Sequence, residues 1–282
     1  SHVMGFFSVF NSDVIKEVQL YKGGIPARYG GRLSSVLDIR MKEGNSKNFA
    51  ATGGLGTVSS RLTLESPILK QKGSIVVAGR ASYADQFLRF SKNKALEDTK
   101  LHFYDLNLKA NYKISDNDRV FLSGYFGRDI MKFSDLFGMA WGNTTGTLRW
   151  NHIYNSRLFS NLTVIYSDYD YLLEGDDGQA AFDWHSGIKD MSVKLDYNYY
   201  LNPNNTISFG VMGTRHEMDP GNISSSGDQE FNSLDISDRN SMEYGAYASN
   251  EHAITDWLTV QYGLRYSIFQ NVTLTAIKTD LL

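Results

Sequence analysis

Long runs in which apolar and polar residues alternate one by one place the strongest constraint on the fold of this 282-residue chain. From Tyr104 to Ile114, every second residue is apolar or aromatic, and the residues between them are Asp, Asn and Lys. The same period of two returns in Met191–Leu201 and Leu258–Ile268. Because successive side chains of a strand point to opposite faces, each run predicts a strand with one apolar and one polar face.

Runs of this kind predict an all-β chain with about eleven strands. They are expected at Phe49–Thr57, Ser59–Pro67, Ser74–Ser82, Phe103–Ile114, Arg119–Arg128, Trp141–Tyr154, Leu158–Asp170, Gly187–Leu201, Thr206–His216, Met242–Ile254 and Trp257–Phe269.

The connections between these strands alternate between short and long. Short ones are expected at Leu69–Lys72, Ser115–Asp118, Tyr154–Arg157, Leu201–Asn205 and Ile254–Asp256. Long ones are expected at Tyr83–Leu101, Asp129–Ala140, Tyr171–Ser186 and Glu217–Ser241. An antiparallel meander with tight turns at one end and long loops at the other is typical of an outer-membrane β-barrel. A soluble sandwich of two sheets would show no such asymmetry.

Aromatic residues with a polar atom lie near the ends of the predicted strands. They include Tyr104, Tyr112, Trp150, Tyr197, Tyr199 and Trp257. Such rings suit a membrane interface, although cross-strand packing in a soluble sheet also enriches aromatic residues. The polar faces carry too many charged and amide groups for a packed core, so we expect them to line a lumen.

Composition and motifs exclude several functional classes. The net charge of −3 is too close to neutral to indicate a nucleic-acid partner. The chain has no cysteine, which excludes disulfides, thiolate metal sites and thiol nucleophiles. No apolar run approaches the about 20 residues that a spanning helix needs. We found no catalytic or phosphate-binding motif, and the six histidines are scattered singly, so we expect no enzyme, metal site or cofactor.

Two of the predicted loops contain many acidic residues. They are Glu174–Asp177 with Asp183, and Asp219–Asp238. Clustered oxygen ligands can hold Ca²⁺, but solvated loops are also commonly acidic, and the sequence does not separate the two. The same holds for a set of aromatic residues that either line a ligand funnel or pack within the loops: Phe133, Tyr169, Tyr171, Phe182 and Trp184.

The stretch Val14–Gly44 differs from the rest of the chain in its glycine content. Two strand-like runs, Val14–Leu20 and Leu33–Met41, flank a turn. This turn contains Gly23, Gly24, Pro26, Arg28, Tyr29, Gly30, Gly31 and Arg32. The glycine pairs permit positive φ or a close approach of another chain segment.

The motif Pro26–Gly31, followed by Ser35–Ile39 and Lys42–Gly44, resembles the end of the plug domain of TonB-dependent outer-membrane receptors. The phrases YKGGIPARYGGR and SSVLDIRMKEGN are similar to the Bacteroidetes branch of that family, and Gly54–Lys70 resembles its first barrel hairpin. The family's barrel has about 22 strands, so the chain is expected to supply half of it.

The resemblance implies a transmembrane β-barrel meander, a partial barrel, preceded by the end of a plug. We therefore expect residues 5–47 to be the C-terminal part of the plug and residues 48–282 to be the N-terminal half of the barrel. Residues 1–4, Ser-His-Val-Met, have the composition of an expression-vector remnant.

The resemblance also implies a function, which is import of a nutrient across the bacterial outer membrane. The nutrient would be a glycan, a peptide or a metal chelate. The implied partners are outer-membrane lipid, the TonB energy complex acting through a segment upstream of this chain, and a surface lipoprotein. The alternatives are a non-transporting outer-membrane barrel for binding or adhesion, and a soluble β-sandwich lectin.

In receptors of this family, the arginine of the plug motif pairs with carboxylates on the inner barrel wall. Arg28 occupies that position, and Arg32 is expected to assist it. The candidate partners on predicted inward faces are Asp105, Asp190, Asp196, Glu243 and Glu251. An ion pair in a shielded lumen would hold the plug more firmly than a surface pair. The alternative is that Arg28 is an ordinary surface residue of a turn.

Overall fold

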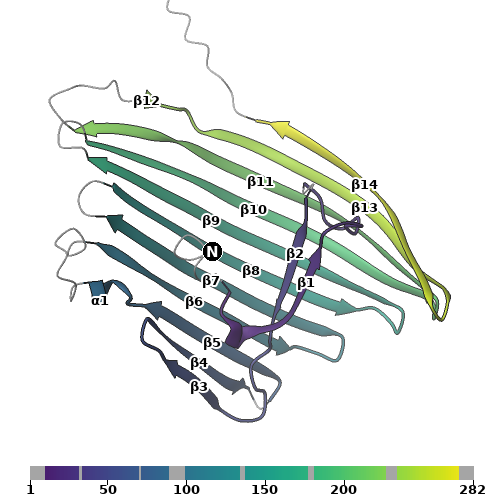
Figure 1. Ribbon diagram of the computed structural model, residues 1–282. Coiled ribbons are helices and arrows are strands. Elements are labelled where there is room, and N and C mark those ends of the chain that lie inside the picture. The colour runs from purple at the N-terminus through teal and green to yellow at the C-terminus, as the bar shows by residue number, and fades with distance from the viewer. Residues whose placement is uncertain are drawn as a thin grey trace, which may run out of the picture.

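A computed structural model describes residues 10–31, 34–69, 71–88, 99–133, 137–176, 181–226 and 234–272. Within these residues, eleven antiparallel strands follow one another as a meander in a single sheet, from β3 at one edge to β14 at the other (Figure 1). A short strand, β12, pairs with β11 outside this path. The predicted all-β meander is confirmed, and the two-sheet sandwich is not formed.

The strands of this sheet, called the wall below, have the following bounds: β3 Ala50–Leu55, β4 Ser59–Ile68, β5 Gly73–Ser82, β6 Lys100–Lys113, β7 Asp118–Phe133, β8 Phe137–Ile153, β9 Leu158–Asp176, β10 Ala181–Asn202, β11 Asn205–Ser226, β12 Leu234–Asp235, β13 Arg239–Thr255 and β14 Leu258–Asn271. A short helix, α1 Asp85–Leu88, follows β5. None of the helical segments in the described ranges is long and apolar enough to span a membrane.

Three of the predicted long loops are wrong over much of their length. The stretch Asp129–Ala140 is mostly strand, because β7 continues to Phe133 and β8 begins at Phe137. Likewise, β9 and β10 extend into Tyr171–Ser186, and β11 extends into Glu217–Ser241. Apolar and polar residues still alternate in these segments, but each kind now lies on the opposite side of the sheet. At the same end of the wall, β3 and β4 are joined by a tight turn, so the alternation of short and long connections is not strict.

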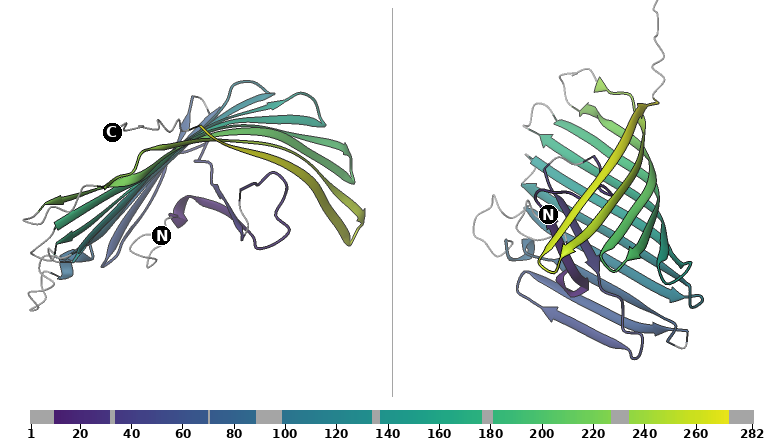
Figure 2. Two further views of the ribbon diagram at one scale, coloured as in Figure 1. Left: turned by 90° about the horizontal axis from the view of Figure 1, so that it is seen from above. Right: turned by 90° about the vertical axis from the view of Figure 1, so that its right-hand side faces the viewer.

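A second, two-stranded sheet precedes the wall. It is an antiparallel hairpin of β1 Ile15–Tyr21 and β2 Val36–Met41, entered through the 3₁₀ turn η2 Ser12–Val14. This hairpin lies on the concave side of the curved part of the wall (Figure 2). It follows that one face of the wall is turned toward the hairpin, and we call this the inner face.

A small apolar core joins the base of the hairpin to the wall. Val14 and Val76 are almost fully buried, and Ala78 and Met41 pack with them. The outer face is different, because large apolar side chains are exposed along it, among them Leu106, Leu148, Val193 and Leu264 at 48%, 50%, 45% and 83%. Exposed apolar side chains over so many neighbouring strands require an apolar environment rather than water.

Candidate functional site

Polar contacts between the hairpin segment and the wall define the inner face. Four of these contacts lie at the base of the hairpin: Glu65 with Lys42 at 2.7 Å, Arg61 with Asp13 at 3.1 Å, Lys109 with the Met41 carbonyl at 2.6 Å and Arg119 with Glu43 at 3.7 Å. The strand register places all four wall residues on one face of the sheet. The base of the hairpin is therefore held by direct ion pairs as well as by the apolar core.

The tip of the hairpin contains the turn that the sequence singles out. Tyr29 donates a hydrogen bond from its backbone N–H to the Pro26 carbonyl and one from its hydroxyl to Asp38 at 2.7 Å. The guanidinium of Arg28 lies over the Tyr29 ring, 4.8 Å from its centroid, and Tyr21 contacts the same ring at 5.7 Å. The turn thus has an internal structure of its own.

Protonation in this turn follows from these contacts. Burial, together with the bond to Asp38, raises the pKa of Tyr29 to about 12. Burial acts to lower the pKa of Arg28, but Tyr29, Tyr21 and Asp38 outweigh it and raise that pKa. Arg28 is consequently a permanent cation stabilised by the hairpin itself. Among the described residues, it makes no ion pair with a wall carboxylate, and Arg32 lies outside them.

The wall contacts this turn through Arg265 on β14 and Glu243 on β13. The Arg265 guanidinium donates a hydrogen bond to the Ala27 carbonyl at 3.4 Å and lies 3.9 Å from Glu243. Gly30 packs directly against Arg265, and any side chain there would collide with the guanidinium. Gly31 has a φ of +69°, and a β-carbon on it would lie 3.7 Å from Glu243. These two glycines therefore let the turn lie flat against the wall.

The remaining glycines of the motif have a simpler role. Gly24 has a φ of +59°, which only glycine adopts readily, whereas a β-carbon at Gly23 would meet nothing within 4 Å. A β-carbon on Gly24 would likewise meet nothing within 4 Å, so this pair shapes the start of the turn and provides no close approach to the wall.

All five candidate carboxylates occupy inward positions, but their partners differ from the predicted one. Asp105 forms an ion pair with Arg80 at 2.6 Å, and its side chain has no exposure. Asp196 accepts a hydrogen bond from the Tyr247 hydroxyl at 2.6 Å. Asp190 accepts one from His216 Nδ1 at 2.7 Å. Glu251 is exposed near the short-turn end of β13, beside Thr206 in the register. Of the five carboxylates, only Glu243 lies beside the turn at the tip of the hairpin.

His216 connects two of these carboxylates. Its second ring nitrogen, Nε2, lies 3.7 Å from Glu243, which in turn approaches Arg265. A chain of polar contacts therefore runs along the inner wall from Asp190 through His216, Glu243 and Arg265 to the Ala27 carbonyl. Sequence reasoning overlooked Arg265 and His216 because it sought carboxylate partners for Arg28. The available signal was that both occupy polar, inward positions of alternating runs.

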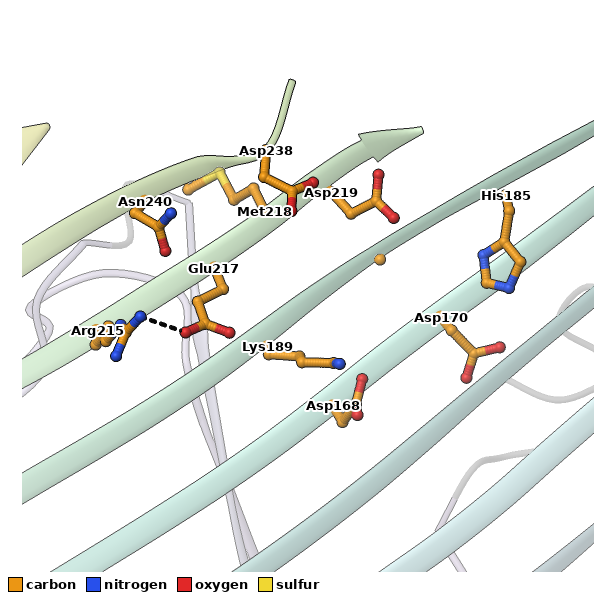
Figure 3. Close-up of a pocket in the computed structure, with 11 residues that line it drawn as sticks. Asp168, Asp170, His185, Lys189, Arg215, Glu217, Met218, Asp219, Asp238 and Asn240 are labelled. Atoms are coloured by element: carbon orange, nitrogen blue, oxygen red, sulfur yellow. Dashed lines mark ion pairs between the residues drawn. The ribbon is translucent and has the colours of Figure 1, made fainter. Parts of the chain in front are cut away.

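The outer face changes character toward the long-connection end. There a hollow of about 530 Å³ is lined mainly by charged residues, including Asp168, Lys189, Glu217 and Asp219 (Figure 3). Arg215 pairs with Glu217 at 2.6 Å, and Lys189 lies between Asp168 and Glu217 in the view. Charges on a lipid-facing strand surface are destabilising, so this part of the outer face is suited to water rather than lipid tails.

The second acidic stretch, Asp219–Asp238, contributes to this charged surface. No group of three or more His, Asp or Glu residues in the described ranges is arranged to hold a metal ion. Asp219 and Asp238 line the hollow. Asp177, Asp228 and Glu230 lie outside the described residues.

Comparison with solved structures identifies proteins that share this architecture. The pyoverdine outer membrane receptor FpvA of Pseudomonas aeruginosa matches with a TM-score of 0.69 at 12% identity, over 93% of this chain and 47% of the receptor. The copper transporter OprC matches with 0.69 at 11%, over 90% and 42%. The siderophore receptor PiuA of Acinetobacter baumannii matches with 0.65 at 13%, over 93% and 49%. No protein-family model and no curated protein matches the sequence.

At these identities, the comparison establishes a shared fold. The chain spans less than half the length of these receptors, as 42–49% of each is covered. The wall and hairpin therefore have the fold of part of a TonB-dependent receptor barrel.

Proposed function

We propose that this chain is part of a TonB-dependent outer-membrane receptor of Bacteroidetes type, with the hairpin as the end of its plug and the wall as half of its barrel. The observation that carries the proposal is the division of the wall into two faces. The inner face binds the hairpin through polar contacts, and the outer face exposes apolar side chains where the hairpin binds the other side.

The apolar part of the outer face has the height of a bilayer. On β10, the outward residues from Tyr199 back to Met191 are apolar or aromatic, and Lys189 is the first charged one. On β6, the outward residues from Tyr104 to Tyr112 form the same pattern. Each run covers about nine residues, the length that a membrane-spanning strand requires. Near the short turns, Trp150, Tyr154 and Tyr197 extend a chain of ring contacts across neighbouring strands, which suits a lipid interface.

In this proposal, the contact between the tip of the hairpin and Arg265–Glu243 is the one that breaks when the plug moves. The TonB energy complex would act through an upstream segment, and a surface lipoprotein would deliver the nutrient. The predicted role of Arg28 and Arg32 in holding the plug remains part of the proposal. The neighbours' names include copper and siderophore uptake, so a metal chelate is a candidate nutrient beside a glycan or a peptide.

A reversible crosslink tests the proposal in the full-length protein. A β-carbon added at Gly263 would lie 3.0 Å from the Ala27 β-carbon, which is shorter than the about 3.8 Å of a disulfide, and it would also lie 2.7 Å from the Ser249 β-carbon and 2.9 Å from the Ala248 carbonyl. The wall must therefore shift slightly to accept the crosslink, which would join the only two cysteines of this chain. We expect the Ala27→Cys/Gly263→Cys protein to support nutrient-dependent growth only when reduced. The Ala27→Cys and Gly263→Cys single variants are the matched controls.

Candidate nutrients are supplied one at a time to a strain that lacks the wild-type gene: glycans, peptides and ferric chelates as the sole source of carbon, nitrogen or iron. Growth that needs the gene and an active TonB complex, and that stops on oxidation, supports the proposal. A protein that reaches the outer membrane and binds ligand, but supports no growth in either redox state, would instead be the adhesion-type barrel.

A further inference from the structure

Along β7–β10, apolar and polar side chains swap between the two faces of the wall. Near the short turns, apolar side chains point outward and polar ones inward. Toward the long connections the pattern reverses, as Arg128, Asp168 and Lys189 point outward while aromatic side chains point inward. The register of these four strands contains no irregularity, so the reversal lies in the sequence and not in a slip of pairing.

The inward aromatic residues lie on the same face of three neighbouring strands, and together we call them the aromatic wall. It consists of Phe137 and Trp141 of β8, Tyr169 and Tyr171 of β9, and Phe182 and Trp184 of β10. The ring centroids of Tyr169 and Tyr171 are 6.4 Å apart, and those of Tyr171 and Trp184 are 6.2 Å apart. Tyr169, Phe182 and Phe137 are 38%, 40% and 37% exposed. Three of the rings thus contact one another in series, and rings of the set still offer open faces.

Trp184 is held in place by an irregularity in the neighbouring strand. The register between β10 and β11 shifts between His185 and Gly187, and Gly221 adopts a φ of +114° at that bulge. The Trp184 indole donates a hydrogen bond to the Pro220 carbonyl at 3.3 Å, and it occupies the space that a side chain at Gly221 would need. The local backbone is therefore shaped around this ring.

The hairpin leaves the aromatic wall uncovered. Its contacts with the wall are made by residues such as Glu65, Lys109 and Arg265, none of which belongs to the reversed segment. In Figure 1, the hairpin lies to the right of the left-hand ends of β7–β10. Those ends are the ones that the long connections join.

The charged residues near the aromatic wall indicate which kind of ligand this surface can bind. The reversed part of β7–β10 lies between the level of Tyr125 and the long connections. Among its described residues, no inward position carries Lys or Arg, and the inward acidic residues are Asp129 and Asp190. Asp129 is 3% exposed, and Asp190 is hydrogen-bonded to His216. An anionic ligand would find no cationic partner here. A neutral ligand would find ring faces, the Tyr169 and Tyr171 hydroxyls, and Asn143, whose buried side-chain oxygen has no protein partner.

We propose that the aromatic wall binds an electrically neutral ligand that has flat ring faces and hydroxyl groups, which is the chemistry of an oligosaccharide. The C–H faces of sugar rings stack on aromatic rings, and their hydroxyl groups match the polar atoms at the ring edges. A neutral ligand also loses less hydration than an ion on entering a surface without counter-charges. This inference rests on the proposed function and names its ligand class.

The test is a binding titration with the full-length protein in detergent. The probes are neutral oligosaccharides of the starch, cellulose, xylan and mannan types, and ferric enterobactin as an anionic aromatic chelate. We expect at least one oligosaccharide to bind and to change the tryptophan fluorescence. Tyr169→Ala should weaken that binding about three- to tenfold, as loss of one stacked ring predicts.

Tyr166→Ala is the matched control, because Tyr166 lies on the same strand with 44% exposure but points outward. Trp184→Leu is a second variant with the same expected loss, which guards against a local effect of Tyr169→Ala. The inference is overturned if only ferric enterobactin binds, if no probe binds, or if Tyr166→Ala weakens binding as much as Tyr169→Ala. Any of these results leaves the crosslink experiment, and with it the proposed function, intact.

Discussion

Removal of Arg265 should loosen the tip of the hairpin without unfolding its base. The Arg265 side chain is 12% exposed, donates to the Ala27 carbonyl at 3.4 Å and lies 3.9 Å from Glu243. A hydrogen bond from a charged donor contributes about 1.5–3 kcal/mol, and the long distances here place the Arg265 contact near the lower end. Arg265→Ala should therefore shift the docked–undocked equilibrium by about 1–2 kcal/mol, which corresponds to about a 5- to 30-fold rise in the undocked population.

The assay uses a cysteine at the contact itself. Ala27→Cys keeps the carbonyl that Arg265 binds and provides a thiol in a chain that has no other. The rate of maleimide labelling reports how often the turn leaves the wall, and it should rise by the same factor in the Arg265→Ala background. Arg215→Ala is the control, because Arg215 points outward, is 58% exposed and pairs with Glu217 on the same strand. Equal labelling rates in the two backgrounds would refute the assignment of Arg265 as the contact that holds the turn.

Three further predictions concern the base, the outer face and the pH response. Val14→Ala removes about two buried methyl groups from the core at the hairpin base, so we expect a loss of about 1.5 kcal/mol, measured as faster proteolysis within β1. Val193→Arg places a charge in the middle of the outer apolar surface and should lower the free energy of unfolding in lipid by about 2–4 kcal/mol. His185→Arg, which lies beyond that surface, should lower the same free energy by about 1 kcal/mol or less, as measured by urea titration. The Tyr29 contact, in which a neutral hydroxyl donates to Asp38, should be present below about pH 10 and be lost as the pH rises through about 12, because the folded pKa is the raised one. The difference in tyrosinate absorbance between wild type and Tyr29→Phe reports this titration, and a midpoint near 10 would contradict it.

The strands were predictable because their signal is local. The alternation of Tyr104–Ile114 appears in β6, and the five predicted short connections fall between successive strands of the wall. The long connections were predicted poorly for a physical reason. Toward that end, Tyr169 and Tyr171 point inward and Asp168 and Asp170 outward, so the apolar-outward pattern used to recognise strands breaks down although the strands continue.

The contacts at the turn were beyond the sequence for a different reason. Ala27 and Arg265 are separated by 238 residues, and no local pattern says which inward residue faces which part of the hairpin. The period of two assigned Asp105, Asp190, Asp196, Glu243 and Glu251 to one face, and the strand register turns all five toward the side of the hairpin. It did not show that Arg80, His216 and Tyr247, which share that face, would satisfy three of them.

The order of polar contacts along the wall explains how the turn can be held and still be released. If the turn leaves, Arg265 loses the Ala27 carbonyl but keeps Glu243, and Glu243 keeps His216, which remains bonded to Asp190. Arg265, Glu243 and Asp190 thus each keep a partner, so release avoids the large penalty of breaking a buried ion pair from one side. The base is built in the opposite way. Withdrawal of Lys42 would leave Glu65 without its ion-pair partner, and withdrawal of Asp13 would do the same to Arg61. Either movement would also expose Val14. A pull on the chain should therefore free the tip first, and the base should act as the fixed end.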